Sequence, residues 1–139
     1  MKSSFVVLVV LLSKLFALGA DPEPYLKSAP MPFYPPLCRT ARIRGTVTVH
    51  FTVNENGDTS DIEADGPKLL REAVVQDLKD WKFGWAQPCS CHVKKEVLFV
   101  YKISDKWVDD EGPTSLVRWF GKSPVTRVEI EAGGRTVQP

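Results

Sequence analysis

The chain has 139 residues, which suits one ordinary domain and leaves little room for a second independent core. Hydrophobic residues make up 43% of the sequence and charged residues 25%, so the chain is apolar enough to fold and too apolar to be disordered. Because the formal net charge is only +1 and the acids and bases are interspersed, no field of one sign is present to attract nucleic acid.

The first twenty residues predict an export signal. Lys2 supplies a positive start, an apolar run follows over 5–12, and small residues close the segment at Ala20. An uncleaved membrane anchor is the alternative, but the apolar run before Lys14 is much shorter than the roughly 20 residues that a spanning helix needs. We therefore expect residues 1–20 to be a cleaved signal peptide of an exported protein.

The next segments predict an arm followed by two strands. Residues 21–36 contain six of the eleven prolines, which favours an extended arm or linker. From Gly45 to Val53, apolar and polar residues alternate, as is typical of a half-buried strand. Asn56-Gly57 then predicts a hairpin turn, so a second strand is expected over 58–64.

A helix and a third strand follow. Apolar residues at three- and four-residue spacing predict an amphipathic helix from Leu69 to Trp81. Gly84 is available to stop the helix, and the aromatic residues around it are available to cover a core. β-Branched and aromatic residues over 93–103 predict the third strand.

The tail predicts an additional hairpin. Residues 116–120 are apolar, residues 125–131 alternate, and Gly133-Gly134 could turn the chain into a last strand at 135–137. The order strand, strand, helix, strand and hairpin predicts an α+β fold of two layers, in which an antiparallel sheet carries one helix on one face.

Export also changes how the three cysteines are interpreted, because an oxidising compartment permits disulfides. A bond from Cys38 to Cys89 or Cys91 would close a loop of about fifty residues, which the chain-entropy model values at roughly 3 to 4 kcal/mol. A Cys89–Cys91 bond would close a very small ring, of a kind more often used in redox chemistry than in structural stapling. We favour the long bridge, with the small ring or a cysteine-linked dimer as alternatives.

The sequence contains no recognisable catalytic or cofactor site. Zinc could be held by Cys38, Cys89, Cys91 and His92, but the last two residues are adjacent and awkward on an extended backbone. His50 has no nucleophile or paired carboxylate at a catalytic spacing. We therefore expect a disulfide with one free thiol, no metal, no cofactor and no enzymatic activity.

Several motifs follow one another in an order that resembles the C-terminal domain of TonB. They are Tyr34-Pro35, a Gly-x-Val-x-Val-x-Phe-x-Val strand at 45–53, an Asn-Gly turn at 56–57, a helix rich in Leu and Ala from Leu69, and Trp-x-Phe at 81–83. The resemblance covers about residues 30–103. It implies a TonB C-terminal-like domain over 37–104, followed by an extension over 105–139 that contains the hairpin.

The resemblance implies a periplasmic binding module that pairs an edge strand with an extended peptide, such as the TonB box of an outer-membrane receptor. The strand over 93–103 is the natural edge, with pairing candidates Val97, Phe99, Tyr101 and Ile103. A hairpin after this strand could occupy the same edge. Two alternatives remain open: a structural or dimerising envelope module without a peptide ligand, and a thiol redox protein that uses Cys89 and Cys91.

Overall fold

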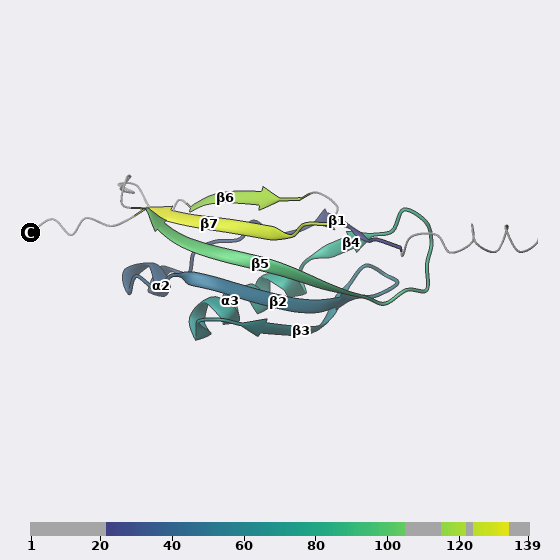
Figure 1. Cartoon of the computed structure of the whole chain (residues 1–139), viewed down its shortest axis with the longest axis horizontal. Helices are drawn as coiled ribbons and strands as arrows, with labels where there is room; N and C mark the ends of the chain where they lie inside the picture. Colours follow the sequence, from purple (N-terminus) through teal and green to yellow (C-terminus); the bar gives the residue numbers. More distant parts are fainter. Residues whose placement is uncertain (1–21, 105–114, 122–123, 134–139) are drawn as a thin grey trace, which may run out of the picture.

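The computed structural model of the chain describes residues 22–104, 115–121 and 124–133 (Figure 1). The signal peptide expected over 1–20 and the last strand expected at 135–137 lie outside these ranges.

Most strands belong to one five-stranded sheet, with the strand order β3-β2-β5-β7-β6. Its members are β2 (Gly45–Val53), β3 (Thr59–Asp65), β5 (Val93–Ser104), β6 (Ser115–Phe120) and β7 (Arg127–Gly133). A second, two-stranded sheet pairs β1 (Tyr25–Ser28) with β4 (Lys82–Gly84). The helices are the short α2 (Pro36–Thr40) and the longer α3 (Lys68–Lys79). The predicted α+β fold with a helix packed against a sheet is therefore confirmed.

The large sheet is mixed, whereas the sequence pattern predicted an antiparallel one. β2 runs antiparallel to β3 and to β5, and β6 runs antiparallel to β7, but β7 runs parallel to β5. The reason is the path of the chain: after β5 it returns as β6, turns, and places β7 between β6 and β5 (Figure 1). The hairpin partner of β7 is thus β6, the apolar stretch noted in the sequence.

The core lies on one face of the sheet, beneath α3 and the aromatic residues that follow it. The four apolar residues of the alternating pattern in β2 are buried, as are three residues on α3 (Val47, Val49, Phe51, Val53, Leu70, Val74 and Leu78). Trp81 is fully buried at the centre of this layer. Its ring centroid lies 5.8 Å from that of Phe99 on β5 and 5.7 Å from that of Trp119 on β6. One tryptophan therefore joins the middle of the sheet to its C-terminal edge.

The proline-rich segment predicted as an arm or linker packs against the core. Tyr34 is buried, its hydroxyl donates a hydrogen bond to the carbonyl oxygen of Ile43, and its ring meets the edge of Tyr101 at 5.3 Å. Pro24 and Pro32 are also buried. Residues 22–36 consequently form part of the folded structure.

The predicted Asn-Gly turn joins β2 to β3 and also contacts β4. Gly57 has a φ of 81°, in the region that favours glycine. Its carbonyl oxygen accepts a hydrogen bond of 2.8 Å from the backbone N–H of Phe83. A Cβ atom at this position would lie 1.9 Å from the carbonyl oxygen of Phe83. The turn therefore requires glycine both for its backbone angle and for the close approach of β4.

Candidate functional site

The strand predicted to offer a free edge lies inside the sheet. β5 pairs with β2 from Val93 to Tyr101 and with β7 from Leu98 to Ser104. The pairing candidates Val97, Phe99 and Tyr101 are buried, and Ile103 is partly buried against the same core. The expectation of an open edge along this strand is therefore wrong from Leu98 onward, because β7 of the same chain occupies it.

The half of β5 before Leu98 lies beside the start of the proline-rich segment. Lys95 projects to the core side of the sheet and forms an ion pair with Glu23. Its side chain is 14% exposed, whereas that of Glu23 is 42% exposed. The N-terminal segment thus contacts the core face of β5 in the part of the strand that β7 leaves unpaired.

β7 is anchored by its own side chains as well as by backbone pairing. Val128, Ile130 and Ala132 are fully buried. At the end of the strand, Arg39 of α2 donates hydrogen bonds of 3.4 Å to the carbonyl oxygen of Gly133 from two of its guanidinium nitrogens. The C-terminal strands consequently complete the core of the domain.

The opposite face of β7 carries a cluster of charges. Glu129, which is only 9% exposed, lies 3.1 Å from Lys102 Nζ and 3.6 Å from Arg127 Nε. The guanidinium carbon of Arg127 lies 4.0 Å from the ring centroid of Phe120 on β6. The two cations compensate the buried carboxylate, and the cation–π contact ties β6 to the same cluster.

Among the described residues, β3 and β6 are the two outermost strands of the large sheet. β3 is interrupted by a register shift opposite His50 and Thr52, with Asp61 at a φ of 49°. Its exposed residues are acidic: Asp61, Glu63 and Asp65. A bulge and exposed charges are features that protect an edge from pairing with another chain.

The other outermost strand, β6, has no register shift, and its one exposed charged residue is Arg118. All six of its residues pair with β7 without a register shift. Leu116 is 52% exposed and Trp119 is 36% exposed. β6 is therefore the more regular and more apolar of the two edges of the described sheet. The strand-pairing candidates predicted from the sequence did not include it. The apolar stretch 116–120 was the available signal, but nothing local revealed that it would become outermost.

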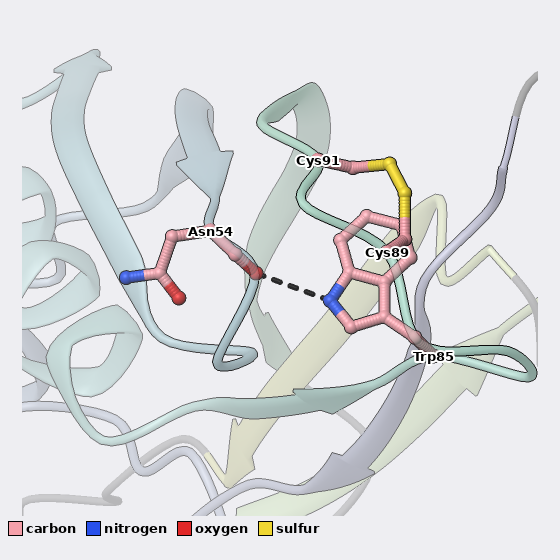
Figure 2. Close-up of a disulfide and its surroundings, with 4 residues drawn as sticks. All are labelled: Asn54, Trp85, Cys89 and Cys91. Carbon is pink, nitrogen blue, oxygen red and sulfur yellow. Dashed lines mark hydrogen bonds between the residues drawn. A yellow bond between two sulfur atoms is a disulfide. The ribbon is translucent and has the colours of Figure 1, made fainter.

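The cysteine pairing differs from the favoured prediction. Cys89 and Cys91 form a disulfide in the loop between β4 and β5, with Cα atoms 5.1 Å apart (Figure 2). Trp85 enters the same loop and donates a hydrogen bond of 3.1 Å from Nε1 to the carbonyl oxygen of Asn54 (Figure 2). A bridge from Cys38 is not formed because α2 lies at one end of the sheet and this loop at the other (Figure 1).

Cys38 is a free cysteine that is fully buried on α2. Burial raises the pKa of its thiol, which keeps the sulfur protonated and unreactive near neutral pH. A buried thiol cannot reach a cysteine of a second chain without local unfolding. Because α2 and the loop before β5 lie at opposite ends of the sheet (Figure 1), Cys38 does not join Cys89, Cys91 and His92 in the zinc set considered above.

No helix within residues 22–104, 115–121 and 124–133 is long and apolar enough to cross a membrane. The same ranges contain no group of three or more His, Cys, Asp or Glu residues that could hold a metal ion.

Comparison with known families supports the resemblance seen in the motifs. The sequence matches the family described as Gram-negative bacterial TonB protein C-terminal over residues 30–103, which is more than half of the chain. The match includes every element from α2 to β4 and nearly all of β5, whereas β6 and β7 follow it. No curated protein matches the chain closely enough to count as a relative.

Proposed function

The chain belongs to the Gram-negative bacterial TonB protein C-terminal family, and on that premise we propose that it is a periplasmic binding module that pairs a strand with an extended peptide of an envelope partner. The family implies a role in TonB-dependent energy transduction and has no known catalytic activity. The partner peptide would be of the TonB-box type carried by outer-membrane receptors.

The outer edge of β6 is the pairing surface in this proposal. The observation that carries it is the strand order, which gives β6 a single neighbour among the described residues and leaves Leu116 more than half exposed. An added strand gains affinity from main-chain hydrogen bonds and specificity from side chains such as Leu116 and Trp119. β3 is a poorer template, because its register shift and its exposed acidic residues oppose pairing with another strand.

Pairing at β6 is favoured over displacement of β7 from β5. Releasing β7 would expose Val128, Ile130 and Ala132, and the two larger residues alone stabilise the fold by about 3 to 6 kcal/mol when buried. A peptide that adds to β6 makes its backbone hydrogen bonds without this loss. β7 thus moves the receptive edge outward by two strands instead of abolishing it.

The test is a titration of the isotope-labelled mature protein with a synthetic TonB-box peptide, followed by NMR. We expect shift changes concentrated in Ser115–Phe120 and slower hydrogen exchange at alternate amides of that strand, since only every second N–H faces outward. Leu116→Ser should weaken binding by about threefold to tenfold, whereas the matched exposed substitution Glu63→Ser on β3 should leave it unchanged.

Three results would contradict the proposal. Shift changes confined to β3 would assign the site to the other edge. Loss of the native β7 signals on titration would show that the peptide displaces β7 and pairs with β5. A complete absence of shift changes would exclude strand pairing with peptides of the TonB-box type.

The disulfide favours one other function, thiol–disulfide exchange. The Cys89–Cys91 bond lies in a loop with both cysteines partly exposed. A thiolate of a partner dithiol would attack one sulfur, form a mixed disulfide, and be resolved by the partner's second thiol, so the partner is oxidised and Cys89 and Cys91 become thiols. Equilibration in glutathione buffers with mass detection tests this function: a bond that stays oxidised over the whole buffer range would exclude it.

A further inference from the structure

An apolar groove lies between α3 and the segment that runs from the proline-rich residues into α2. Its volume is about 720 Å³, and its lining includes Met31, Phe33 and Leu37 from the N-terminal side and Leu69 and Ala73 from α3. Met31 is 69% exposed, and Phe33 and Leu37 are each 64% exposed. Three large apolar side chains exposed along one groove are typical of a surface that binds a partner.

The wall opposite these side chains is acidic. Glu72 and Asp77 of α3 and Asp80, the residue that caps its C-terminus, line it, and no Lys, Arg or His contributes to the lining. Asp77 is oriented by Trp81, whose Nε1 donates a hydrogen bond of 3.1 Å to Asp77 Oδ2. Burial, with a smaller contribution from Asp80, raises the pKa of Asp77 to about 6. The ionised carboxylate is thus destabilised here, and an incoming cation would stabilise it.

The apolar wall is rigid before any ligand arrives. Pro30, Pro32 and Pro35 restrict the backbone of the segment that carries it. Tyr34, between the exposed residues of this wall, is buried and its hydroxyl donates to the carbonyl oxygen of Ile43. A wall held in this way loses little conformational freedom on binding, so more of the contact energy contributes to affinity.

We propose that this groove binds a short segment of a partner protein that combines two or three apolar side chains with a Lys or Arg. The apolar side chains contact Met31, Phe33 and Leu37, and the cation pairs with Asp77 and Asp80. Charge complementarity selects this occupant, because an acidic or uncharged segment would leave the α3 carboxylates unpaired beside a desolvating ligand. The site shares no residue with the β6 edge and does not depend on the function proposed for that edge.

The experiment begins with a display library of randomised short peptides, selected on the immobilised mature protein and counter-selected on its Phe33→Ser variant. We expect the recovered peptides to be enriched in large apolar residues together with Lys or Arg. Replacing the basic residue of the best peptide by Glu should weaken binding by at least about tenfold in fluorescence anisotropy.

Protein variants then locate the site. Leu37→Ser and the double variant Asp77→Asn/Asp80→Asn should each weaken the recovered peptide by about tenfold or more. Leu116→Ser, an equivalent loss of an exposed leucine at the β6 edge, should leave the affinity unchanged. Circular dichroism and thermal unfolding check that each variant keeps the fold. We expect it to be kept, because Leu37 and Asp80 are exposed and an amide at position 77 can still accept from Trp81 Nε1.

The proposal would be overturned by peptides that are acidic, by affinities that do not respond to the Asp77 and Asp80 substitutions, or by peptides that bind at β6. An empty selection would also overturn it. Light scattering measures the oligomeric state of the protein and so tests a second copy of the chain as the occupant. A dimer that Leu37→Ser converts to a monomer would assign the groove to that second copy and overturn the proposal.

Discussion

The two outermost strands of the large sheet, β3 and β6, differ in the regularity and charge of their unpaired edges. β3 is bent by a register shift at Asp61 and carries exposed acidic side chains. β6 runs in continuous register along β7 and exposes Leu116 and Trp119. Because a register shift and a run of like charges oppose strand addition more than a regular edge with one charge does, the contrast favours β6 over β3 as the edge that a partner strand would join.

The largest expected effect tests whether β7 and β6 contribute to the stability of the domain. Ile130 is fully buried on β7, so Ile130→Ala should lower the free energy of unfolding by about 3 kcal/mol. Ile62→Ala, at a partly buried position on β3, should lower it by only about 1 kcal/mol. Urea denaturation followed by tryptophan fluorescence measures both. A smaller loss for Ile130→Ala than for Ile62→Ala would show that β7 and β6 are a loosely attached cap.

The second prediction concerns the turn that leads into β3. Gly57→Ala should destabilise the protein by about 2 kcal/mol or more, because alanine is strained at a φ of 81° and its Cβ meets the Phe83 carbonyl. Glu55→Ala, an exposed change in the same turn, should alter stability by less than about 0.5 kcal/mol. The two thermal midpoints provide the comparison, and equal midpoints would contradict the requirement for glycine.

The third prediction is a pH dependence of the free energy of unfolding. It arises from Asp77 on α3, the helix that packs against β3 and β2. The pKa of Asp77 is about 6 in the fold against an ordinary value of 3.8, so the folded state holds this proton more tightly than the unfolded state. The stabilisation is therefore present below about pH 4 and is lost as the pH rises through 6. The other ionisable groups that face this carboxyl are Glu72 on α3, Asp80 at its C-cap, Cys38 on α2 and Tyr101 on β5.

Asp77→Asn should remove this dependence, because the amide is neutral at every pH and its oxygen can still accept from Trp81 Nε1. After allowance for partial solvent screening, we expect a gain of about 1 to 2 kcal/mol at pH 7 and a flatter stability profile between pH 4 and 7. Glu72→Gln, an exposed change on the same helix, is the control. A variant that is no more stable than the native protein at pH 7 would contradict the assigned cause.

The smallest expected effect separates edge function from stability. Leu116→Ser should change the free energy of unfolding by less than about 0.5 kcal/mol, since the side chain is 52% exposed. The same change should weaken a strand-pairing peptide, as described for the β6 edge. A large loss of stability would mean that Leu116 supports the fold, and the contrast between the two edges would then lose its functional meaning.

Local patterns accounted for most individual elements. The alternation over 45–53, the turn at Asn56-Gly57 and the helical spacing from Leu69 were sufficient because each reflects a requirement within a few residues. The same patterns left the neighbours of each strand undecided. The alternation in 125–131 indicated a strand, but not that its residues would be buried beside β5 and parallel to it.

The candidate sites show the same division. Residue spacing favoured a long bridge from Cys38, and it carried no information that α2 and the Cys89 loop would fold to opposite ends of the sheet. The groove was not predicted, because its apolar wall comes from the proline-rich segment and α2 and its acidic wall from α3 and the residue that caps it. Each wall is unremarkable alone, and only their approach creates a site.

The sequence by itself determined the family, the α+β class and the positions of the main strands and helix, because periodicity and turn chemistry act over short distances along the chain. Only the tertiary structure decided which edge stays open, which cysteines meet and where the groove forms. These features depend on contacts between residues far apart in sequence, whose relative positions follow from burying one shared core around Trp81.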